Sequence, residues 1–591
     1  MAKSRLFKFF LAAVAVSFVF VALAVAGAWM TVLRGPAVPD NSTLIVRIGG
    51  NLVEMPPNDV FGQVAGGGRA QTVRSYVDML RRAKTDPRID SVLIVPTPIE
   101  SPYWGKVQEI RDAIADFKTS GKRISAYLEY AGEREYYLAT AADRIYLMPS
   151  SALDVAGVAT YEVFLKGTLD KIGAQADFEK IGEYKTAPNQ LTETTFTPAH
   201  REMSESLTRD MYEQLVRGIA EGRRKNPEDV RALIDEGPFL AASAQRAGLV
   251  DTLAYEDQLD DYGAVSRSGT VEGEKYARSR RPSMSRGTPR VAVVHVTGVI
   301  TSGEGGFDPL NGDLAGSERL VKAIRTARAD TNVRAIVVRI DSPGGSSVAS
   351  DVLWRELMIT RSDKPDRPVI ASMSDLAASG GYYVAMAASQ IVAQPATLTG
   401  SIGIFGGKFV TGGTYEKLGA NIDAIAIGRN AAIASPDRRF TDSERAKLRE
   451  QIESFYQAFI QKVATSRRMP VERVDELARG RVWTGAQARQ NGLVDALGGL
   501  DRAIALAKER AGIGADTSVE VVTYPPRKTL VELLMEALSG GGSERQLQAL
   551  VSMMAGLRTA ERQALGVLTA PARLFNAGEP LALMPFSFLS R

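Results

Sequence analysis

The sequence predicts an α/β protein in which two related domains follow one another after an N-terminal transmembrane helix. Three observations lead to this prediction. A long apolar run opens the chain, short apolar strands alternate with amphipathic helical stretches, and one half of the sequence repeats in the other. The 591 residues, 45% hydrophobic and 24% charged, have an ordinary globular composition but are too many for one hydrophobic core.

Residues 1–34 are expected to anchor the chain in a membrane. An uncharged run from 9 to 33 follows Lys3, Arg5 and Lys8, and at about 1.5 Å per residue it can cross a hydrocarbon core of about 30 Å. Basic residues before the run favour a cytoplasmic N-terminus and an exported body. The run is longer than the apolar region of most signal peptides, although cleavage after small residues near its end stays open.

An internal repeat organises the rest of the chain. The Tyr-Tyr pair at 136–137 recurs at 382–383, an offset of 246 residues (382 − 136), and further Ala, Gly, Ile, Lys and Pro residues between 139 and 182 recur at that offset. Later, the sequence GLVD at 248–251 returns at 492–495. A period this long indicates a duplicated domain rather than a solenoid.

The repeat divides the chain into predicted domains at 44–262 and 290–512. Between them, residues 263–289 are polar, basic and broken by Gly and Pro, as is typical of a linker. In the second half, the strands VAVVHV, RAIVVRI and PVIASM are each followed by helical periodicity, which favours a largely parallel sheet.

The remaining residues, 513–591, are expected to form a helical tail. A capping-box pattern begins a helix at Thr529, and Gly540 ends it. The apolar sequence LALMPFSFL near the C-terminus is expected to pack on the body of the protein.

The composition excludes several kinds of site. The chain has no cysteine, so disulfides, thiolate catalysis and Cys-ligated zinc are ruled out. Of its two histidines, His295 is predicted to lie in a strand and His200 at an exposed helix start, so a His-rich metal site is impossible and a Ser-His-Asp triad has no support. The net charge is only +4 and no basic stripe carries interleaved aromatics, so nucleic acid is not expected as a partner.

Differences between the halves point to a site. Ser379, in LAASGGYY, corresponds to Glu133 of the first half, whereas Lys185, in IGEYKTA, corresponds to Ala431 of the second. The Gly-Gly of DSPGG at 341–345 also lacks a counterpart, because the first half reads PTPIESP there. Each half therefore has chemistry that the other lacks.

These residue types fit nucleophilic catalysis. A serine hydroxyl needs a base, and a buried lysine with a lowered pKa can serve where histidine is missing. The amides of Gly380, at the start of the predicted helix after Ser379, and of Gly344 or Gly345 could hold an oxyanion. Alone, the serine is an N-cap, the lysine a surface charge and SPGG a turn. Together they predict a Ser-Lys hydrolase.

With these motifs and TGSIGIF at 399–405, the chain resembles the bacterial signal peptide peptidase A (protease IV) family in its long, duplicated form. The resemblance covers about 44–512 and the anchor. It implies a Clp-protease/crotonase-like fold in each half and a homotetramer held in the inner membrane by one span, with the catalytic domains on the periplasmic side. The implied substrates are signal peptides and other short, unfolded apolar peptides, and no cofactor or metal is implied.

The resemblance also implies roles for individual residues. Ser379 would be the nucleophile and Lys185 the general base, while Ser401, in TGSIGIF, would orient the lysine. The family positions for oxyanion-hole amides fall on Gly344, Gly345 and Gly380. The departure at PTPIESP, which has no Gly-Gly, puts a second active site in the first half in doubt.

Two alternatives stay open from the sequence. A crotonase-like acyl-CoA enzyme would share the fold and use glycine amides for a thioester oxyanion, but it would not require both Ser379 and Lys185. A non-catalytic membrane scaffold would use the duplicated domain for assembly alone.

Overall fold

A computed structural model describes residues 36–55, 71–279, 287–308, 312–525, 575, 579–584 and 589–590. The predicted anchor at 1–34 and the predicted tail helix from Thr529 to Gly540 lie outside these residues. Among the helices within them, none is both long enough and apolar enough to span a membrane.

The first half is built on a six-stranded sheet in the order β10-β1-β2-β3-β4-β9, with every neighbouring pair parallel. The interior positions of its central strands are apolar and buried, as in a sheet covered on both faces. The strands are β1 (Ser42–Gly50), β2 (Ile89–Ile99), β3 (Arg123–Leu128), β4 (Arg144–Leu147), β9 (Thr252–Leu253) and β10 (Thr270–Glu272).

The second half has an eight-stranded sheet in the order β21-β19-β17-β15-β11-β23, with β18 joining β17 to β22. All its pairs are parallel except β19 with β21. The three strands predicted from the sequence are β11, β15 and β17, so the α/β prediction is confirmed here. The strands are β11 (Arg290–Thr297), β15 (Val333–Ser342), β17 (Val369–Ala378), β18 (Gln390–Ala393), β19 (Leu398–Gly400), β21 (Val482–Thr484), β22 (Ala496–Leu497) and β23 (Glu520–Tyr524).

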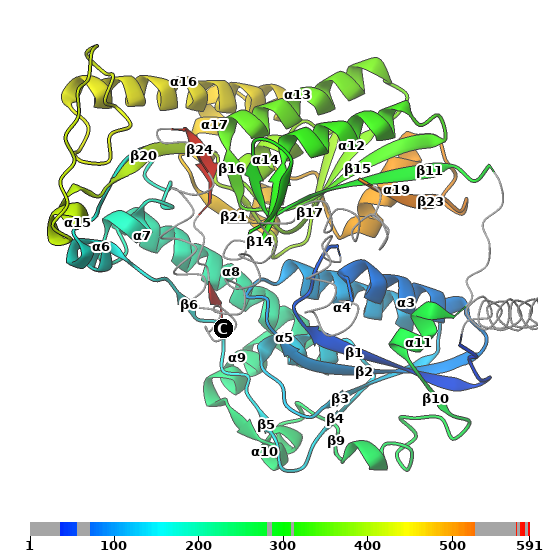
Figure 1. Ribbon diagram of the computed structural model, residues 1–591. Coiled ribbons are helices and arrows are strands. Elements are labelled where there is room, and N and C mark those ends of the chain that lie inside the picture. Colours follow the sequence, from blue (N-terminus) through cyan, green and yellow to red (C-terminus); the bar gives the residue numbers. More distant parts are fainter. Residues whose placement is uncertain are drawn as a thin grey trace, which may run out of the picture.

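Helices pack against both sheets (Figure 1). Those of the first half are α3 (Val73–Thr85), α4 (Gly105–Lys118), α5 (Glu133–Ala139), α6 (Lys166–Ile172), α7 (Asn189–Thr192), α8 (Pro198–Arg223), α9 (Pro227–Glu236), α10 (Ala241–Arg246) and α11 (Gly273–Arg278). Those of the second half are α12 (Ser317–Ala329), α13 (Ser347–Asp363), α14 (Gly380–Ala385), α15 (Gly412–Lys417), α16 (Asp442–Arg467), α17 (Val471–Leu477), α18 (Gly485–Gln490) and α19 (Leu500–Arg510).

A third sheet joins the two halves. Its order is β13-β14-β12-β16-β24-β20-β7, and β20 of the second half pairs antiparallel with β7 of the first along seven residues. Strand β24, from the C-terminal end of the chain, lies between β16 and β20 (Figure 1). The strands are β7 (Gln175–Ile181), β12 (Val299–Thr301), β13 (Gly305–Asp308), β14 (Gly312–Gly316), β16 (Gly344–Ser346), β20 (Ile404–Val410) and β24 (Leu581–Leu583).

The internal repeat is visible in equivalent contacts. The hydroxyl of Tyr136 donates to the carbonyl of Leu249 at 2.6 Å, and the hydroxyl of Tyr382 donates to the carbonyl of Leu493 at 2.9 Å. Helices α8 and α16 each have 26 residues and end in an arginine that pairs with an aspartate. These ion pairs are Arg223–Asp251 at 2.7 Å and Arg467–Asp495 at 2.6 Å.

Both sheets extend past the boundaries drawn from the sequence. Within the segment predicted as a linker, β10 pairs with β1, so the first domain continues to at least α11. Within the predicted helical tail, the described residues include strands: β23 pairs with β11, and β24 enters the third sheet. Leu581, Ala582 and Leu583 are buried, which confirms that this apolar segment packs on the body.

A buried ion cluster holds the two halves together. Arg339 of β15 is 1% exposed, and its guanidinium pairs with Glu54 at 2.7 Å and with Glu109 at 2.6 Å. Burial alone would raise the pKa of Glu54, but Arg339 outweighs burial and lowers that pKa to about 2. Since both glutamates come from the first half, this contact fixes the orientation of the two domains.

Replacing Arg339 with methionine is expected to lower the free energy of unfolding by about 3–5 kcal/mol, because two buried carboxylates lose their counter-charge. Chemical denaturation of Arg339→Met measures the loss. The matched control is Arg123→Met, which removes an exposed ion pair with Asp90 and is expected to cost no more than about 1 kcal/mol. Equal losses in the two variants would contradict the assignment.

Candidate active site

Ser379 lies at a sharp turn between β17 and α14. Its backbone has φ 55° and ψ −112°, a conformation that L-residues rarely adopt, and its amide donates to the carbonyl of Gly400 at 2.7 Å. The parallel strand ends there and the helix begins at the next residue, so the side chain stands at the edge of the sheet. The helix start predicted from LAASGGYY is confirmed.

Lys185 reaches this serine from the first half. It lies in the loop between β7 and α7, and its Nζ is 2.8 Å from the Oγ of Ser379. The same nitrogen lies 3.1 Å from both the Oγ and the carbonyl oxygen of Ser401. All three residues are fully buried. The structure therefore brings together the serine, the lysine and the accessory serine singled out from the sequence.

Two backbone loops hold the lysine in place. The amide of Tyr184 donates to the carbonyl of Arg479, and the amide of Gly480 donates to the carbonyl of Ile402, at 3.0 and 2.9 Å. A Cβ on Gly480 would collide with the backbone of Lys185, so the loops pass too close for any other residue. Sequence reasoning missed this loop, because its role depends on a contact between halves.

Burial sets the protonation of Lys185. Desolvation lowers its pKa well below the usual value for lysine, and among the described residues no carboxylate counteracts this shift. An amine in this environment is uncharged more readily than a surface lysine and can accept a proton. The site therefore contains a base next to a hydroxyl.

The three predicted oxyanion glycines lie next to one another and next to β24. In β16, Gly344 is paired with Leu583 and Gly345 with Ala582. A Cβ on Gly344 would collide with the carbonyl oxygen of Ala582 and come within 2.7 Å of the Gly380 amide nitrogen. A backbone carbonyl from the chain's own tail thus occupies this corner. The Gly344 amide donates to the Oγ of Ser342 at 3.2 Å.

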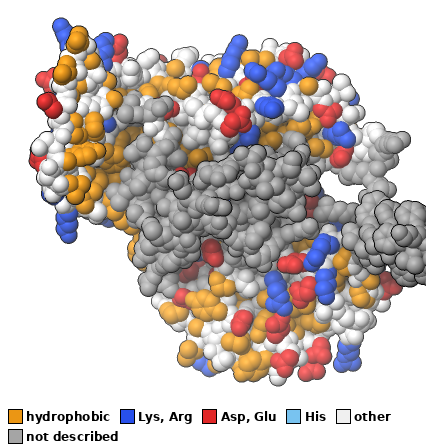
Figure 2. All heavy atoms as spheres, in the orientation of Figure 1, with side chains coloured by type: hydrophobic (Ala, Val, Ile, Leu, Met, Phe, Trp, Pro, Cys, Tyr) orange, Lys and Arg blue, Asp and Glu red, His pale blue; other side chains and the backbone are white. Residues whose placement is uncertain are grey.

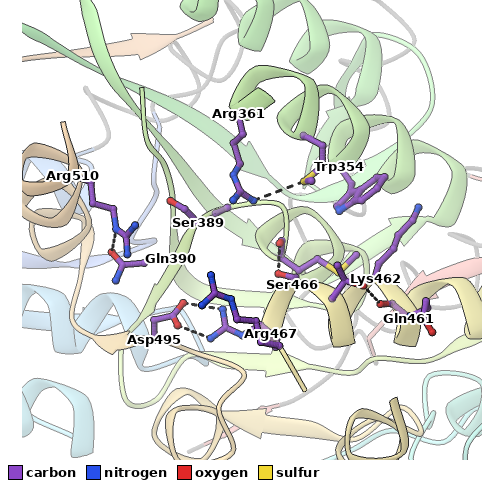
Figure 3. A pocket seen from close by; sticks show the side chains of 15 residues that line it. Trp354, Arg361, Ser389, Gln390, Gln461, Lys462, Ser466, Arg467, Asp495 and Arg510 are labelled. Carbon is purple, nitrogen blue, oxygen red and sulfur yellow. Dashed lines mark hydrogen bonds and ion pairs between the residues drawn. The ribbon is translucent and has the colours of Figure 1, made fainter. Parts of the chain in front are cut away.

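A separate pocket of about 750 Å³ lies between α13, α16 and α19 (Figure 3). Its lining contains neither Ser379 nor Lys185, and three of its four arginines have partners: the Ala387 carbonyl for Arg361, Asp495 for Arg467 and Gln390 for Arg510. We therefore assign it no part in the chemistry. In the described part of the chain, no cluster of three or more His, Asp or Glu side chains could hold a metal ion.

The histidines play no part in the site. His295 lies in β11, as predicted. The prediction that His200 is exposed is wrong: it is fully buried in α8, beside Phe196, and its ring pairs with Glu162 at 2.8 Å. A buried partner for this ring could not be seen from the polar sequence around it.

Comparisons with known proteins identify a family. The family model described as "Peptidase family S49" matches residues 116–263 and 361–514. The chain is 38% identical to "Serine protease SPPA, chloroplastic" of Arabidopsis thaliana over 78% of this chain and 68% of that protein. It is 30% identical to "Protease 4" of Salmonella typhi over 91% of this chain and 89% of that protein.

Solved structures are less similar. The chain matches a "1510-N membrane-bound stomatin-specific protease" with 16% identity and a TM-score of 0.25, over 43% of this chain and 99% of that one. The α/β architecture of two domains is therefore confirmed from the strand order itself, and the name Clp-protease/crotonase-like stays a prediction.

Removing the amine of Lys185 is expected to slow the reaction of Ser379 with a fluorophosphonate by about 10²–10⁴-fold, the usual contribution of a general base. In the parent, labelling is expected to rise with pH, with a midpoint below the ordinary lysine pKa, because the neutral amine is the active form. Gel-based labelling of the full chain in detergent measures both, with Lys166→Ala, an exposed lysine, as control. Equal labelling of Lys185→Ala and the parent would exclude this lysine as the base.

Proposed function

This chain belongs to peptidase family S49 and is a serine peptidase, and we propose that Ser379 and Lys185 form its catalytic dyad. The observation that carries the proposal is the 2.8 Å contact between the buried Nζ and Oγ, made between two halves of one chain. Neither half alone contains both groups. The acyl-CoA and scaffold alternatives are not favoured, because the family is one of peptidases.

The hydrogen bonds around Lys185 fit an uncharged amine. Its two N–H groups can donate to the Oγ and the carbonyl oxygen of Ser401, which leaves the nitrogen lone pair for the hydroxyl of Ser379. In the proposed first step, the lone pair takes the hydroxyl proton while Oγ attacks the peptide carbonyl. Ser401 thus orients the base.

The later steps use the same groups. The amides of Gly380 and of the Gly344–Gly345 loop would stabilise the negative oxygen of the tetrahedral intermediate, and each such donor is typically worth about 10²–10³ in turnover. Lys185 then returns its proton to the leaving amine, and an ester of Ser379 remains. Finally Lys185 takes a proton from water as the water oxygen attacks the ester carbonyl. The bond between the carbonyl carbon and Oγ then breaks, and Lys185 gives the proton to Oγ, which releases the acid product and restores Ser379.

The third sheet suggests how a peptide binds. Strand β24 lies antiparallel between β16 and β20, with the Ala582 carbonyl beside Gly344 and Gly380. We infer that a substrate takes this place as an extended strand, so that backbone hydrogen bonds provide affinity and the side chains meet alternate pockets. The occupant here is apolar, Leu-Ala-Leu, which supports apolar peptides as substrates.

We propose the substrates and the location that the family resemblance implies. The place that the apolar strand β24 occupies between β16 and β20 suits apolar peptides. Cleaved signal peptides are short, apolar and unfolded, and an enzyme anchored by residues 1–34 in the inner membrane, with its domains on the periplasmic side, would meet them where they are released. The charge pattern of the N-terminal segment supports this orientation.

A homotetramer is proposed as the assembly. An exposed apolar patch lies beyond α15, at the left of Figure 2, where Leu418, Ile425 and Ile427 are 77%, 98% and 93% exposed. Patches of this kind mark contact surfaces. The occupant that we propose is a second copy of this chain.

Deleting residues 579–591 is expected to increase kcat/KM for a short apolar peptide by about tenfold or more, because β24 would no longer compete with the substrate for the place between β16 and β20. Hydrolysis of a fluorogenic peptide measures this, and the same deletion with Ser379→Ala is the control. Ala582→Asp is a second route to displacing β24, should the deletion impair folding. Unchanged kinetics in a folded deletion variant would contradict the proposal that the substrate binds in the place of β24.

Light scattering of the full chain in detergent is expected to give the mass of a tetramer. Placing charges in the apolar patch, as in Ile425→Asp with Ile427→Asp, is expected to shift the protein to smaller species. Tyr255→Asp, at an exposed aromatic of the first half, is the control. A tetramer that persists in the double variant would show that this patch is not the contact.

A further inference from the structure

A second lysine from the first half is buried against the second half. The Nζ of Lys106 lies 2.7 Å from a carboxylate oxygen of Asp341 and 3.2 Å from one of Asp375, both in the second half. The side chains of the three residues are 9%, 12% and 1% exposed. The catalytic scheme above does not use this ammonium.

The two aspartates lie at the ends of the strands that present the catalytic groups. Asp341, in β15, comes three residues before Gly344, and Asp375, in β17, comes four residues before Ser379. One ammonium therefore joins the strand that leads to the glycine loop with the strand that leads to the nucleophile.

The ladder between these strands is broken at the same point. Ile340 pairs with Met373 but Ser342 pairs with Ala377, so β17 contains extra residues opposite Asp341. The Asp341 carboxylate accepts from the Leu376 amide at 3.2 Å and bridges part of this bulge. Without regular strand pairing, the spacing between the glycine loop and Ser379 depends on such side-chain contacts.

Helix α4 fixes the lysine from the other side of the junction. The backbone amide of Lys106, in its first turn, donates to the other carboxylate oxygen of Asp375 at 2.8 Å. The N-cap residue, Trp104, offers no side-chain acceptor, so Asp375 takes that role from the second half. A Cβ on Gly105 would lie 2.8 Å from the Ser374 carbonyl, which shows how closely the helix approaches β17.

We propose that Lys106 is a positioning residue for peptide hydrolysis: by bridging Asp341 and Asp375, it sets the distance between the oxyanion-binding glycines and the nucleophile. This inference rests on the proposed function of Ser379 and Lys185. The residue touches neither the substrate nor the reacting atoms and acts through the ends of two strands.

The charges around Lys106 suit this role and exclude that of a base. Burial disfavours its ammonium, but Asp341 and Asp375 outweigh burial and raise the pKa of Lys106, so it keeps its proton. Burial raises the pKa of Asp341, whose carboxylate shares the ammonium with Asp375. The other titratable groups that act on this trio are Glu54, Tyr103, Arg134 and, through Glu54, His295 and Arg339.

Steady-state hydrolysis of a fluorogenic apolar peptide by the full chain in detergent tests the proposal. For Lys106→Met, kcat is expected to fall by about 10²-fold with little change in KM, because a misplacement of about 1 Å in the reacting groups costs that much. The pH midpoint for fluorophosphonate labelling of Ser379 is expected to stay where it is in the parent, since the surroundings of Lys185 are intact. Lys122→Met, which removes two hydrogen bonds to backbone carbonyls within the first half, is the control and is expected to leave kcat unchanged.

A double variant separates positioning from simple charge balance. Lys106→Met leaves two buried carboxylates without a counter-charge and is expected to lower the melting temperature, whereas Lys106→Met with Asp375→Asn removes one of those charges and is expected to recover much of that loss. Both variants lack the Lys106 ammonium that bridges β15 and β17. Recovered stability without recovered kcat supports positioning, and recovery of both would overturn it.

The outcomes also distinguish this inference from the proposed function. If Ser379→Ala hydrolyses the peptide at the parent rate, the dyad itself is wrong, whatever Lys106 does. If Ser379→Ala is inactive while Lys106→Met retains the parent kcat, the dyad stands and only the positioning role fails.

Discussion

The contact between Lys185 and Ser379 depends on keeping an amine buried at the junction of two domains. Desolvation lowers the lysine pKa only while the junction excludes water, and the two atoms stay 2.8 Å apart only while the domains keep one orientation. The hydrophobic core of the first half extends across the junction to Leu376, Ala378 and Leu398 of the second. The ion cluster around Arg339 and the third sheet also hold the two halves together, so much of the fold maintains the distance between Lys185 and Ser379.

The duplication explains how such a junction could arise. Both halves keep the same tyrosine contacts and the same arginine–aspartate pairs at the ends of their long helices, which maintain the domain fold. They differ where chemistry is needed. Glu133, which occupies the place of the serine, accepts from the Ala156 amide at 3.1 Å and caps a loop, and Val155, in the place of Ser401, is buried. The first half has thus become a support that contributes a lysine.

Much of this could be predicted from the sequence, and the remainder has a physical reason. Strand alternation predicted the α/β sheets and the repeat predicted two related domains. Comparing the halves singled out Ser379 and Lys185, because a duplicated chain carries its own alignment, whereas Ser401 came from the family resemblance. The domain ends could not be placed, since β10, β23 and β24 are short strands whose identity depends on pairing with distant partners. The contacts of Gly480 and Lys106 and the burial of His200 were missed for the same reason: each depends on residues distant in the sequence.

Unfavourable backbone conformations around Ser379 and Lys185 cost free energy that contacts at the domain junction must offset. Ser379, Ser401 and Arg479 are three of the six non-glycine residues with positive φ in the described chain, and their loops hydrogen-bond to one another or to the lysine loop. Such conformations cost about 1–3 kcal/mol each and persist only where surrounding contacts hold them. Two buried lysines of the first half differ in their electrostatic surroundings: burial lowers the pKa of Lys185, whereas Asp341 and Asp375 outweigh burial and raise the pKa of Lys106. Nearby carboxylates, rather than depth of burial, therefore set the direction of the pKa shift at the proposed base and at the proposed positioning residue.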